Sequence, residues 1–269
     1  MTPSETRLLQ NKTAVIYGAG GAIGGAVARA FAREGAQVFL TGRQRGPVED
    51  LAHEIIRSGG SATAAEVDAL DEAAIDQHLQ SVSAQAGRVD ISFNAVGFPD
   101  STIVGRPLLE LPLENFSRPI NDYMRSYFLT ARLAARRMVA QKSGVIMTVT
   151  SIPAREGTTL NGGYGSAHAA KDALTRDLSA ELAPHGIRVV ALRPHGLVET
   201  GTMQELYDTK LGKSGMTFEQ FKNYLANWGH PKRLQLLPEV GNTAAFIASD
   251  LASAITGTTV NLTMGGVSD

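Results

Sequence analysis

The sequence has no cysteine among its 269 residues and a formal net charge of only −1. Without cysteine, a disulfide scaffold, a cysteine nucleophile and any thiolate metal site are excluded. The near-zero charge predicts no nucleic-acid partner and no attraction to an anionic membrane. No uncharged run reaches the roughly 20 residues that a membrane span requires. Because redox chemistry does not constrain the compartment, we expect a cytoplasmic protein.

The sequence also shows no pattern typical of metal ligands. The six histidines show no spacing typical of a metal site, so no metal is expected. Glycine, by contrast, is abundant: 28 of 269 residues is about 10%, against a usual ~7%. The length suits one large α/β domain, and no linker, repeat or low-complexity segment divides the chain. We therefore predict a single domain over residues 1–269.

Short β-branched runs alternate with segments of helical periodicity along most of the chain. Strands are expected at 13–17, 37–41, 62–67, 90–94, 145–149, 188–192 and near 259–262. Helices follow them, the longest at about 122–140 and 165–182, with another at about 238–248. This alternation predicts a parallel sheet with helices on both faces.

One region, 196–237, shows no such alternation and is expected to be irregular. It carries five aromatic residues, Tyr207, Phe218, Phe221, Tyr224 and Trp228. They indicate either a substrate-binding lid inserted over residues 197–237 or simple anchoring of this excursion to the body of the protein.

The glycines cluster between the first strand and the first helix, in Gly18-Ala-Gly-Gly-Ala-Ile-Gly24. A glycine turn in this setting lets the backbone approach a pyrophosphate closely, and the following helix start offers unpaired amides. The predicted dinucleotide contacts in this turn are Gly18, Gly20, Ala22, Ile23 and Gly24.

Further motifs follow in order along nearly the whole chain. They are Asn94-Ala-Val-Gly97, Ser151 placed 13 residues before Tyr164, Ala180-Glu-Leu-Ala-Pro-His-Gly-Ile-Arg-Val189, Pro194, and Ser249-Asp-Leu-Ala-Ser-Ala-Ile-Thr-Gly257 with Gly265-Gly266. In this order and spacing the sequence resembles the short-chain dehydrogenase/reductase family. The glycine turn departs from the family pattern, because Tyr17 stands where the family has threonine and Ala22 where it has glycine.

The resemblance implies a Rossmann-type, doubly wound fold with a mainly parallel, seven-stranded sheet. It implies hydride transfer between a nicotinamide cofactor and a small carbonyl or secondary alcohol substrate, as in a 3-oxoacyl reductase. It also implies a homotetramer or homodimer formed through the two long helices. The further cofactor contacts that it implies are Asp68, Ala69, Asn94, Ala95, Gly97, Tyr164, His168, Pro194, Leu197 and Thr200.

The end of the second strand, Thr41-Gly42-Arg43, bears on the choice of cofactor. NAD-dependent enzymes usually carry an acidic residue here, whereas an arginine accommodates the 2′-phosphate of NADP. Gly42 takes the acidic position and Arg43 follows, so we predict NADP(H) rather than NAD(H). Arg43 as a solvated surface charge is the alternative. Asp68 and Thr200 are equally expected to act as helix caps.

The resemblance assigns proton exchange with the substrate to Tyr164 and a hydrogen bond to the substrate oxygen to Ser151. The family lysine, which holds the nicotinamide ribose and supplies positive charge, is missing. His168 stands in its place, four residues after Tyr164, and Lys171 follows after seven. At 100° per residue, all three share one helix face.

Three hypotheses follow. An imidazole at His168 replaces the lysine by bonding the ribose and, when protonated, by favouring the ionised tyrosine. Alternatively Lys171 supplies the charge, as the Tyr-x6-Lys spacing of the enoyl-thioester reductases suggests, although Ser151 would then be unneeded. Or the chain has lost its chemistry and only binds a nucleotide. The family's relay asparagine is also displaced, with Tyr123 at its position and Asn121 two residues earlier.

Overall fold

The computed structural model describes residues 7–98 and 103–268. Seven strands form one sheet in the order β3-β2-β1-β4-β5-β6-β7, and every neighbouring pair is parallel. The strands are β1 (Thr13–Tyr17), β2 (Gln37–Gly42), β3 (Ser61–Glu66), β4 (Ile91–Asn94), β5 (Gly144–Val149), β6 (Ile187–Pro194) and β7 (Thr258–Leu262). The predicted Rossmann-type α/β fold is confirmed, with a sheet that is parallel throughout.

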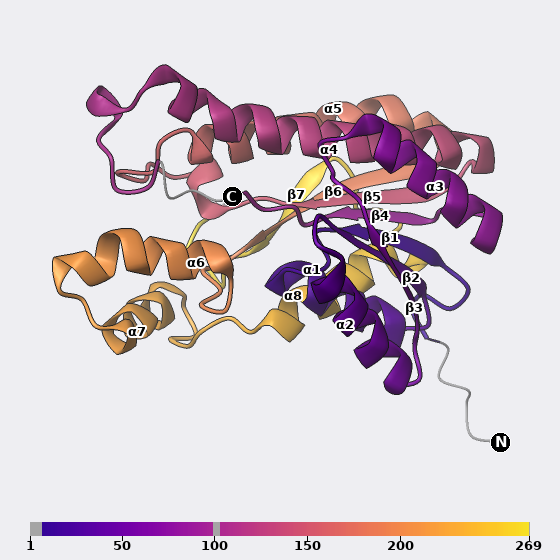
Figure 1. Cartoon of the computed structure of the whole chain (residues 1–269), viewed down its shortest axis with the longest axis horizontal. Coiled ribbons are helices and arrows are strands. Elements are labelled where there is room, and N and C mark those ends of the chain that lie inside the picture. The colour runs from indigo at the N-terminus through magenta and orange to yellow at the C-terminus, as the bar shows by residue number, and fades with distance from the viewer. Residues whose placement is uncertain (1–6, 99–102, 269) are drawn as a thin grey trace.

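Helices cover both faces of this sheet (Figure 1). One layer contains α1 (Ala22–Arg33), α2 (Arg45–Arg57) and α8 (Leu237–Ala248), and the other contains α3 (Glu72–Ala86), α4 (Leu113–Gln141) and α5 (Tyr164–Leu182). Each layer encloses its own buried core. Along β1, Ala14 and Ile16 face the first core whereas Val15 and Tyr17 face the second, as the alternation of side chains along a strand requires.

The longest helix, α4, begins at Leu113, nine residues before its expected start. Pro119 lies inside it and is buried. An interior proline removes one backbone hydrogen bond and usually ends a helix, so sequence periodicity alone detected only the part after it. The first turns of α4 carry the chain past the loop that contains Gly163, whose backbone packs against Phe116.

The segment 196–237 is mostly helical, so the expectation of an irregular region was wrong. It contains α6 (Gly201–Leu206), a π-helical turn η4 (Tyr207–Leu211), a 3-10 turn η5 (Gly212–Ser214) and α7 (Phe218–Trp228). Side-chain caps start both α-helices: Thr200 accepts from the Met203 amide, and Thr217 forms a capping box with Gln220. α6, η4 and η5 are too short for periodicity to reveal them. α7 does show helical spacing, in Phe218, Phe221 and Leu225, and was missed.

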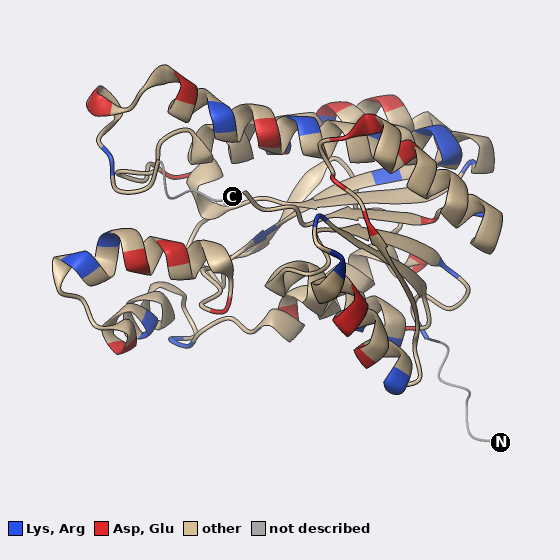
Figure 2. Cartoon of the chain, in the orientation of Figure 1, with Lys and Arg blue, Asp and Glu red and all other residues tan. Residues whose placement is uncertain are grey.

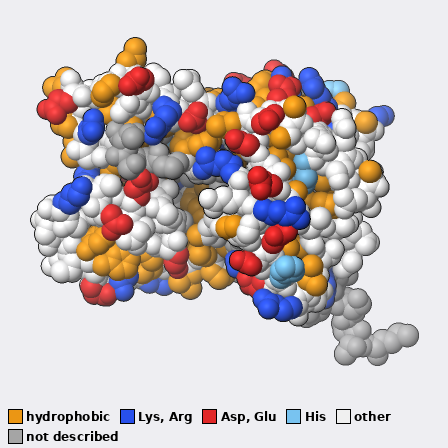
Figure 3. Space-filling model, in the orientation of Figure 1, with side chains coloured by type: hydrophobic (Ala, Val, Ile, Leu, Met, Phe, Trp, Pro, Cys, Tyr) orange, Lys and Arg blue, Asp and Glu red, His pale blue; other side chains and the backbone are white. Residues whose placement is uncertain are grey.

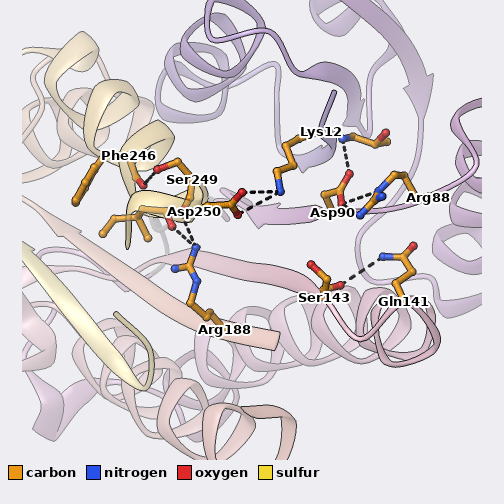
Figure 4. Close-up of polar contacts among 11 residues, drawn as sticks. Lys12, Arg88, Asp90, Gln141, Ser143, Arg188, Phe246, Ser249 and Asp250 are labelled. Atoms are coloured by element: carbon orange, nitrogen blue, oxygen red, sulfur yellow. Dashed lines mark hydrogen bonds and ion pairs between the residues drawn. The ribbon is translucent and has the colours of Figure 1, made fainter. Parts of the chain in front are cut away.

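Polar side chains tie the loops together at the amino ends of the strands (Figure 4). The Asp90 carboxylate accepts from the Thr13 amide at 2.8 Å and from Arg88. Arg188 donates to the carbonyls of Ile247, Ser249 and Ile255. Short 3-10 turns complete the connections: η1 (Leu108–Glu110), η2 (Ile152–Ala154), η3 (Ala183–His185) and η6 (Asp250–Ala252).

Acidic and basic side chains are interspersed over the helices, and the strands are largely uncharged (Figure 2). Within residues 7–98 and 103–268, no helix combines the length and the apolar character needed to cross a membrane.

Candidate active site

A cleft of about 1490 Å³ lies along the carboxyl ends of the strands. Its walls are the loops that follow β1 to β6, together with α6, η4 and α7. Figure 3 shows the hollow between the lobe that carries α6 and α7 and the rest of the molecule. Strand order reverses between β1 and β4, and open α/β sheets bind ligands outside the carboxyl ends of the strands at such a switch point.

The glycine turn forms the floor of this cleft at the start of α1. Gly18 has a φ of 74°, and a Cβ there would lie 2.7 Å from the Ala95 carbonyl oxygen. A Cβ on Gly24 would lie 2.3 Å from the Gly18 oxygen, so both positions require glycine. Gly21 caps α1 without a side chain, and the first turn holds no acidic residue. The helix start therefore presents its amides and positive dipole end to an anion.

All five residues predicted for this turn line the cleft: Gly18, Gly20, Ala22, Ile23 and Gly24.

The two arginines after β2 differ in their surroundings. Arg43 is exposed at the cleft and makes no hydrogen bond or ion pair with the residues that the structure describes. Arg45 lies outside the cleft lining and pairs with Glu49 at 2.6 Å. Gly42, the last residue of β2, leaves no carboxylate at this position. The cleft therefore offers one uncommitted guanidinium beside its glycine turn.

Asp68 and Ala69, after β3, also line the cleft. The Asp68 carboxylate accepts from the Leu70 amide at 2.9 Å. The helix cap is Asp71, which accepts from the amides of Ala73 and Ala74. Helix capping by Asp68 is therefore wrong, because Asp71 does that work.

Asn94 ends β4 but is not part of the cleft lining. Its amide donates to Ser126 and Thr130 at 3.0 Å, and its side-chain oxygen accepts from the Val96 amide. These bonds hold the backbone that follows, and Ala95 and Gly97 from that backbone do line the cleft.

Ser151 and Tyr164 lie in the wall built after β5. Tyr164 is the first residue of α5, and Ser151 precedes the turn η2. Gly165 lets these two elements pack closely, since a Cβ on it would lie 2.8 Å from the Pro153 oxygen. The loop between them closes back on itself, which brings two residues 13 apart in sequence to one cleft.

His168 stands one turn further along α5, also in the cleft wall, with its ring centroid 4.3 Å from that of Tyr164. Only 4% of His168 is exposed, and neither ring nitrogen has a hydrogen-bond partner among the described residues. Burial, with the charge of Lys171, lowers the pKa of His168 well below its usual value. Burial therefore favours the neutral imidazole over the protonated form that would favour tyrosinate.

Comparisons with known proteins identify the family of this chain. A family model described as "Enoyl-(Acyl carrier protein) reductase" matches residues 18–267. The 3-oxoacyl-[acyl-carrier-protein] reductase of Synechocystis is 30% identical, over 96% of this chain and 98% of that protein. The uncharacterized oxidoreductase YxbG of Bacillus subtilis is 31% identical, over 93% of this chain and 88% of that protein. The chain belongs to the short-chain dehydrogenase/reductase family.

Solved structures of short-chain dehydrogenases share the whole fold. Sorbitol-6-phosphate 2-dehydrogenase of Erwinia amylovora superposes with a TM-score of 0.87 at 28% identity, covering 95% of this chain and 100% of that one. A 7α-hydroxysteroid dehydrogenase complexed with NADH and 7-oxo glycochenodeoxycholic acid gives 0.84 at 28% identity, covering 100% and 99%.

The lysine nearest in sequence to the family position is not in the cleft lining. Lys171 is 1% exposed and donates to the Val149 carbonyl oxygen at 2.6 Å. Burial lowers the pKa of Lys171 to about 7, while Asp172 acts in the opposite direction. The shared helix face predicted for residues 164, 168 and 171 is real, but it runs from the cleft down into the core.

Of the two candidates for the short-chain dehydrogenase relay asparagine, only Tyr123 reaches the cleft. Its hydroxyl accepts from the Phe98 amide at 3.3 Å, and its ring contacts those of Tyr164 and His168 at 5.9 and 4.8 Å. Asn121 is exposed and outside the cleft lining.

The loop after β6 adds Pro194, Leu197 and Thr200 to the lining. Thr200 is also the N-cap of α6, so its two expected roles are compatible. His195 lines the cleft as well, with Nε2 bonded to the Leu225 carbonyl at 2.8 Å and its ring 5.1 Å from Trp228.

The aromatic residues of this segment divide between two environments. Tyr207, Phe218 and Phe221 pack against one another, with Phe221 1% exposed, and so anchor the lobe. Tyr224 and Trp228 line the cleft beside Phe221. The anchoring expectation therefore holds for the first three side chains, and the substrate-binding lid stays a prediction.

Sequence reasoning missed the loop that carries Glu156, Thr158, Thr159 and Asn161 along the cleft. Lys210 of η4 donates to the Thr159 carbonyl oxygen at 3.0 Å and so joins the lobe to this loop. The position of the loop between Ser151 and Tyr164 was the available signal, because a connection between two cleft residues must itself pass the cleft.

Proposed function

We propose that the protein is an NADP(H)-dependent oxidoreductase that interconverts a carbonyl and a secondary alcohol. The observation that carries the proposal is the meeting of Ser151, Tyr164 and the unpartnered His168 in one cleft with the glycine turn. A tyrosine beside a serine provides a proton and a second hydrogen bond for one substrate oxygen. Most relatives named above act on hydroxyl or carbonyl groups, which supports the same reaction class.

The described residues fit a dinucleotide. The amides at the start of α1 suit a pyrophosphate, and the buried, unpartnered nitrogens of His168 suit a ribose hydroxyl. Arg43 would bind the 2′-phosphate. The remaining proposed contacts are Asp68, Ala69, Ala95, Gly97, Pro194, Leu197 and Thr200, with Asn94 supporting them through the backbone. When bound, the cofactor supplies or accepts the hydride.

In the reductive direction, the Tyr164 hydroxyl would donate its proton to the carbonyl oxygen, while Ser151 donates a second hydrogen bond to it. A neutral His168 would hold a ligand hydroxyl through one ring nitrogen. Tyr123 takes the place of the relay asparagine, and its ring completes the wall behind Tyr164. Residues 197–237 would close over the substrate as a lid.

The decisive experiment measures NADPH oxidation over a broad panel of carbonyl compounds. We expect turnover with the wild-type protein and a loss of about 10²–10⁴-fold in Tyr164→Phe, which keeps the ring but lacks the proton. The dissociation constant for NADPH should stay within a factor of a few. Ser166→Ala, an exposed position on the same helix, is the matched control. Tight NADPH binding with no turnover on any compound would favour a non-catalytic nucleotide-binding protein instead.

Cofactor preference is tested with the two arginines after β2. Arg43→Ala should weaken NADPH binding by roughly 10–100-fold and leave NADH binding nearly unchanged, because a hydrogen bond to a charged group contributes about 1.5–3 kcal/mol. Arg45→Ala removes a neighbouring charge that is paired with Glu49 and should change neither. An unchanged NADPH preference in Arg43→Ala would contradict the assignment.

The description of the matching family model favours a second candidate, an enoyl-thioester reductase that uses Tyr164 and Lys171. The buried position of Lys171 and the presence of Ser151 in the cleft favour the carbonyl reaction. Enoyl thioesters included in the panel of compounds distinguish the two reactions, because only an enoyl-thioester reductase would reduce them.

We also propose a cytoplasmic homotetramer or homodimer that associates through α4 and α5. Phe128 supports this, since it is 41% exposed on α4 with the Arg132 guanidinium 5.1 Å from its ring centroid.

A further inference from the structure

The cleft is larger than a site for one ligand. Its volume, about 1490 Å³, exceeds the roughly 300–1,000 Å³ of typical small-molecule pockets. Two segments that line it, 156–161 and 203–228, contain none of the proposed cofactor contacts. We call the part of the cleft that these two segments line the substrate half, because it leaves room for a second ligand beside the dinucleotide.

The lobe lines the substrate half with apolar and aromatic side chains. They include Met203, Leu206, Phe221, Tyr224 and Trp228. Tyr224 is 58% exposed, so its ring is accessible to a ligand. Walls of this kind favour a ligand with an apolar body, and the faces of Trp and Tyr rings also attract cations.

The charged side chains of the substrate half are mostly acidic. Among the described residues that line it, Glu156, Glu205 and Asp208 carry carboxylates and Lys210 carries the one positive charge, which leaves a formal charge of −2. The hydrogen bond from Lys210 to the Thr159 carbonyl oxygen joins η4, the turn that carries Asp208, to the loop that carries Glu156. The two acidic segments therefore form one continuous wall.

Two of these carboxylates are accessible to a ligand. Glu156 is exposed, and its side chain makes no hydrogen bond or ion pair with the residues that the structure describes. Asp208 is also exposed and accepts a hydrogen bond at 3.0 Å from the Gln204 side chain, which is uncharged. A cation placed in the substrate half would be attracted by both carboxylates, and an anion would be repelled.

His195 adds a hydrogen-bond acceptor to the cleft lining. Its Nε2 donates to the Leu225 carbonyl oxygen at 2.8 Å, because a carbonyl can only accept. In the neutral ring Nδ1 is then an acceptor, and it has no partner among the described residues although only 3% of His195 is exposed. Burial lowers the pKa of His195, which favours the neutral ring. A buried acceptor without a partner suits a ligand that donates a hydrogen bond.

We propose that the substrate is a carbonyl compound with an apolar body and a protonated amine at the end remote from the carbonyl group. The inference rests on the proposed function, in which Ser151 and Tyr164 donate hydrogen bonds to the carbonyl oxygen. The carboxylates of Glu156 and Asp208 and the His195 Nδ1 are acceptors. The cleft thus selects a ligand that accepts hydrogen bonds at one end and carries a positive charge at the other.

The test compares kcat/KM for the NADPH-dependent reduction of three acetophenones that differ only in the para substituent. A dimethylaminomethyl group is protonated at pH 7, an isobutyl group is its neutral isostere, and a carboxymethyl group is anionic. At saturating NADPH, we expect kcat/KM to be at least about tenfold higher for the cationic than for the anionic ketone. Salt at about 1 M should reduce this ratio by screening the exposed charges. Equal values, or a preference for the anion, overturn the inference.

Two variants assign the preference to the acidic wall. Glu156→Gln and Asp208→Asn each remove one charge and nearly keep the side-chain shape. Each should lower the ratio of cationic to anionic kcat/KM by about two- to tenfold and leave the neutral ketone within a factor of about two. Glu114→Gln, at an exposed position outside the cleft lining, is the control and should keep the wild-type ratio. A wild-type ratio in both cleft variants would show that these carboxylates are only solvated surface charges, and overturns the inference.

Direct binding separates this inference from the proposed function. Isothermal titration calorimetry gives the dissociation constants of the three ketones for the protein saturated with NADP⁺, and the cation should bind more tightly than the anion. If no ketone is reduced while this order is found, the proposed function fails and the inference about the ligand class holds. If ketones are reduced but their charge affects neither binding nor kcat/KM, the proposed function holds and the inference fails.

Discussion

At the scale of single residues, the buried charges of α5 determine how the cleft wall is held. Asp172 lies directly after Lys171 and forms an ion pair with Arg193 in which both side chains are less than a tenth exposed. Thr259 donates a further hydrogen bond to the same carboxylate. The ion pair joins α5 to β6, and the Thr259 bond joins α5 to β7. Together they fix the position of α5 relative to the sheet, and with it the positions of Tyr164 and His168 in the cleft wall.

Replacement of Asp172 by asparagine should therefore destabilise the protein strongly. The change removes the charge of one member of a buried ion pair, which costs about 3–5 kcal/mol. Urea denaturation measures the loss as a lower free energy of unfolding. Asp177→Asn, at an exposed position on the same helix, should stay within about 0.5 kcal/mol of wild type. Equal stabilities for the two variants would show that the pair contributes little.

Motif spacing was sufficient to predict that Ser151, Tyr164 and His168 would meet at the cleft, and their chemical roles stay predictions. It did not indicate which of His168 and Lys171 faces the ligand. Helical periodicity gives the shared face but not the depth of each side chain. That depth depends on Tyr123 and Tyr127, which come from a different helix.

At the scale of elements, the strands and the two helix layers could be predicted because buried parallel strands are continuous apolar runs. The predicted elements were wrong where one local sequence signal opposed another. Pro119 obscured the start of α4, although the surrounding helix continues through it. In 196–237, Thr200 and Thr217 are the N-caps of α6 and α7, and capping threonines of this kind are a start signal that periodicity does not include.

At the scale of the whole molecule, the same buried groups tie stability to pH. The pKa values of His168 and Lys171 are lowered by burial, and those of Tyr17 and Tyr127 are raised by it. The fold favours the neutral forms of His168, Tyr17 and Tyr127 in this way, and it makes Lys171 release its proton at a lower pH than a free lysine does. Below pH 6.5 the unfolded chain gains a proton at His168 that the folded chain does not, and above pH 10 it loses protons from the two tyrosines. Both effects favour unfolding, so the free energy of unfolding should be highest at an alkaline pH.

Lys171 sets the slope of stability with pH between these limits. Between about pH 7 and its ordinary pKa of 10.5, the unfolded chain binds a proton that folded Lys171 has released, so the free energy of unfolding should rise by up to about 1.4 kcal/mol per pH unit. Between pH 7 and pH 9 the wild type should therefore gain about 2 kcal/mol relative to Lys171→Met, as measured by urea denaturation of the cofactor-free proteins. Lys213→Met, at an exposed lysine, should follow the wild type. If the wild-type and Lys171→Met curves run parallel, Lys171 keeps its proton in the folded protein, and the cost of its burial is met by the rings of Tyr123 and Tyr127 rather than by deprotonation.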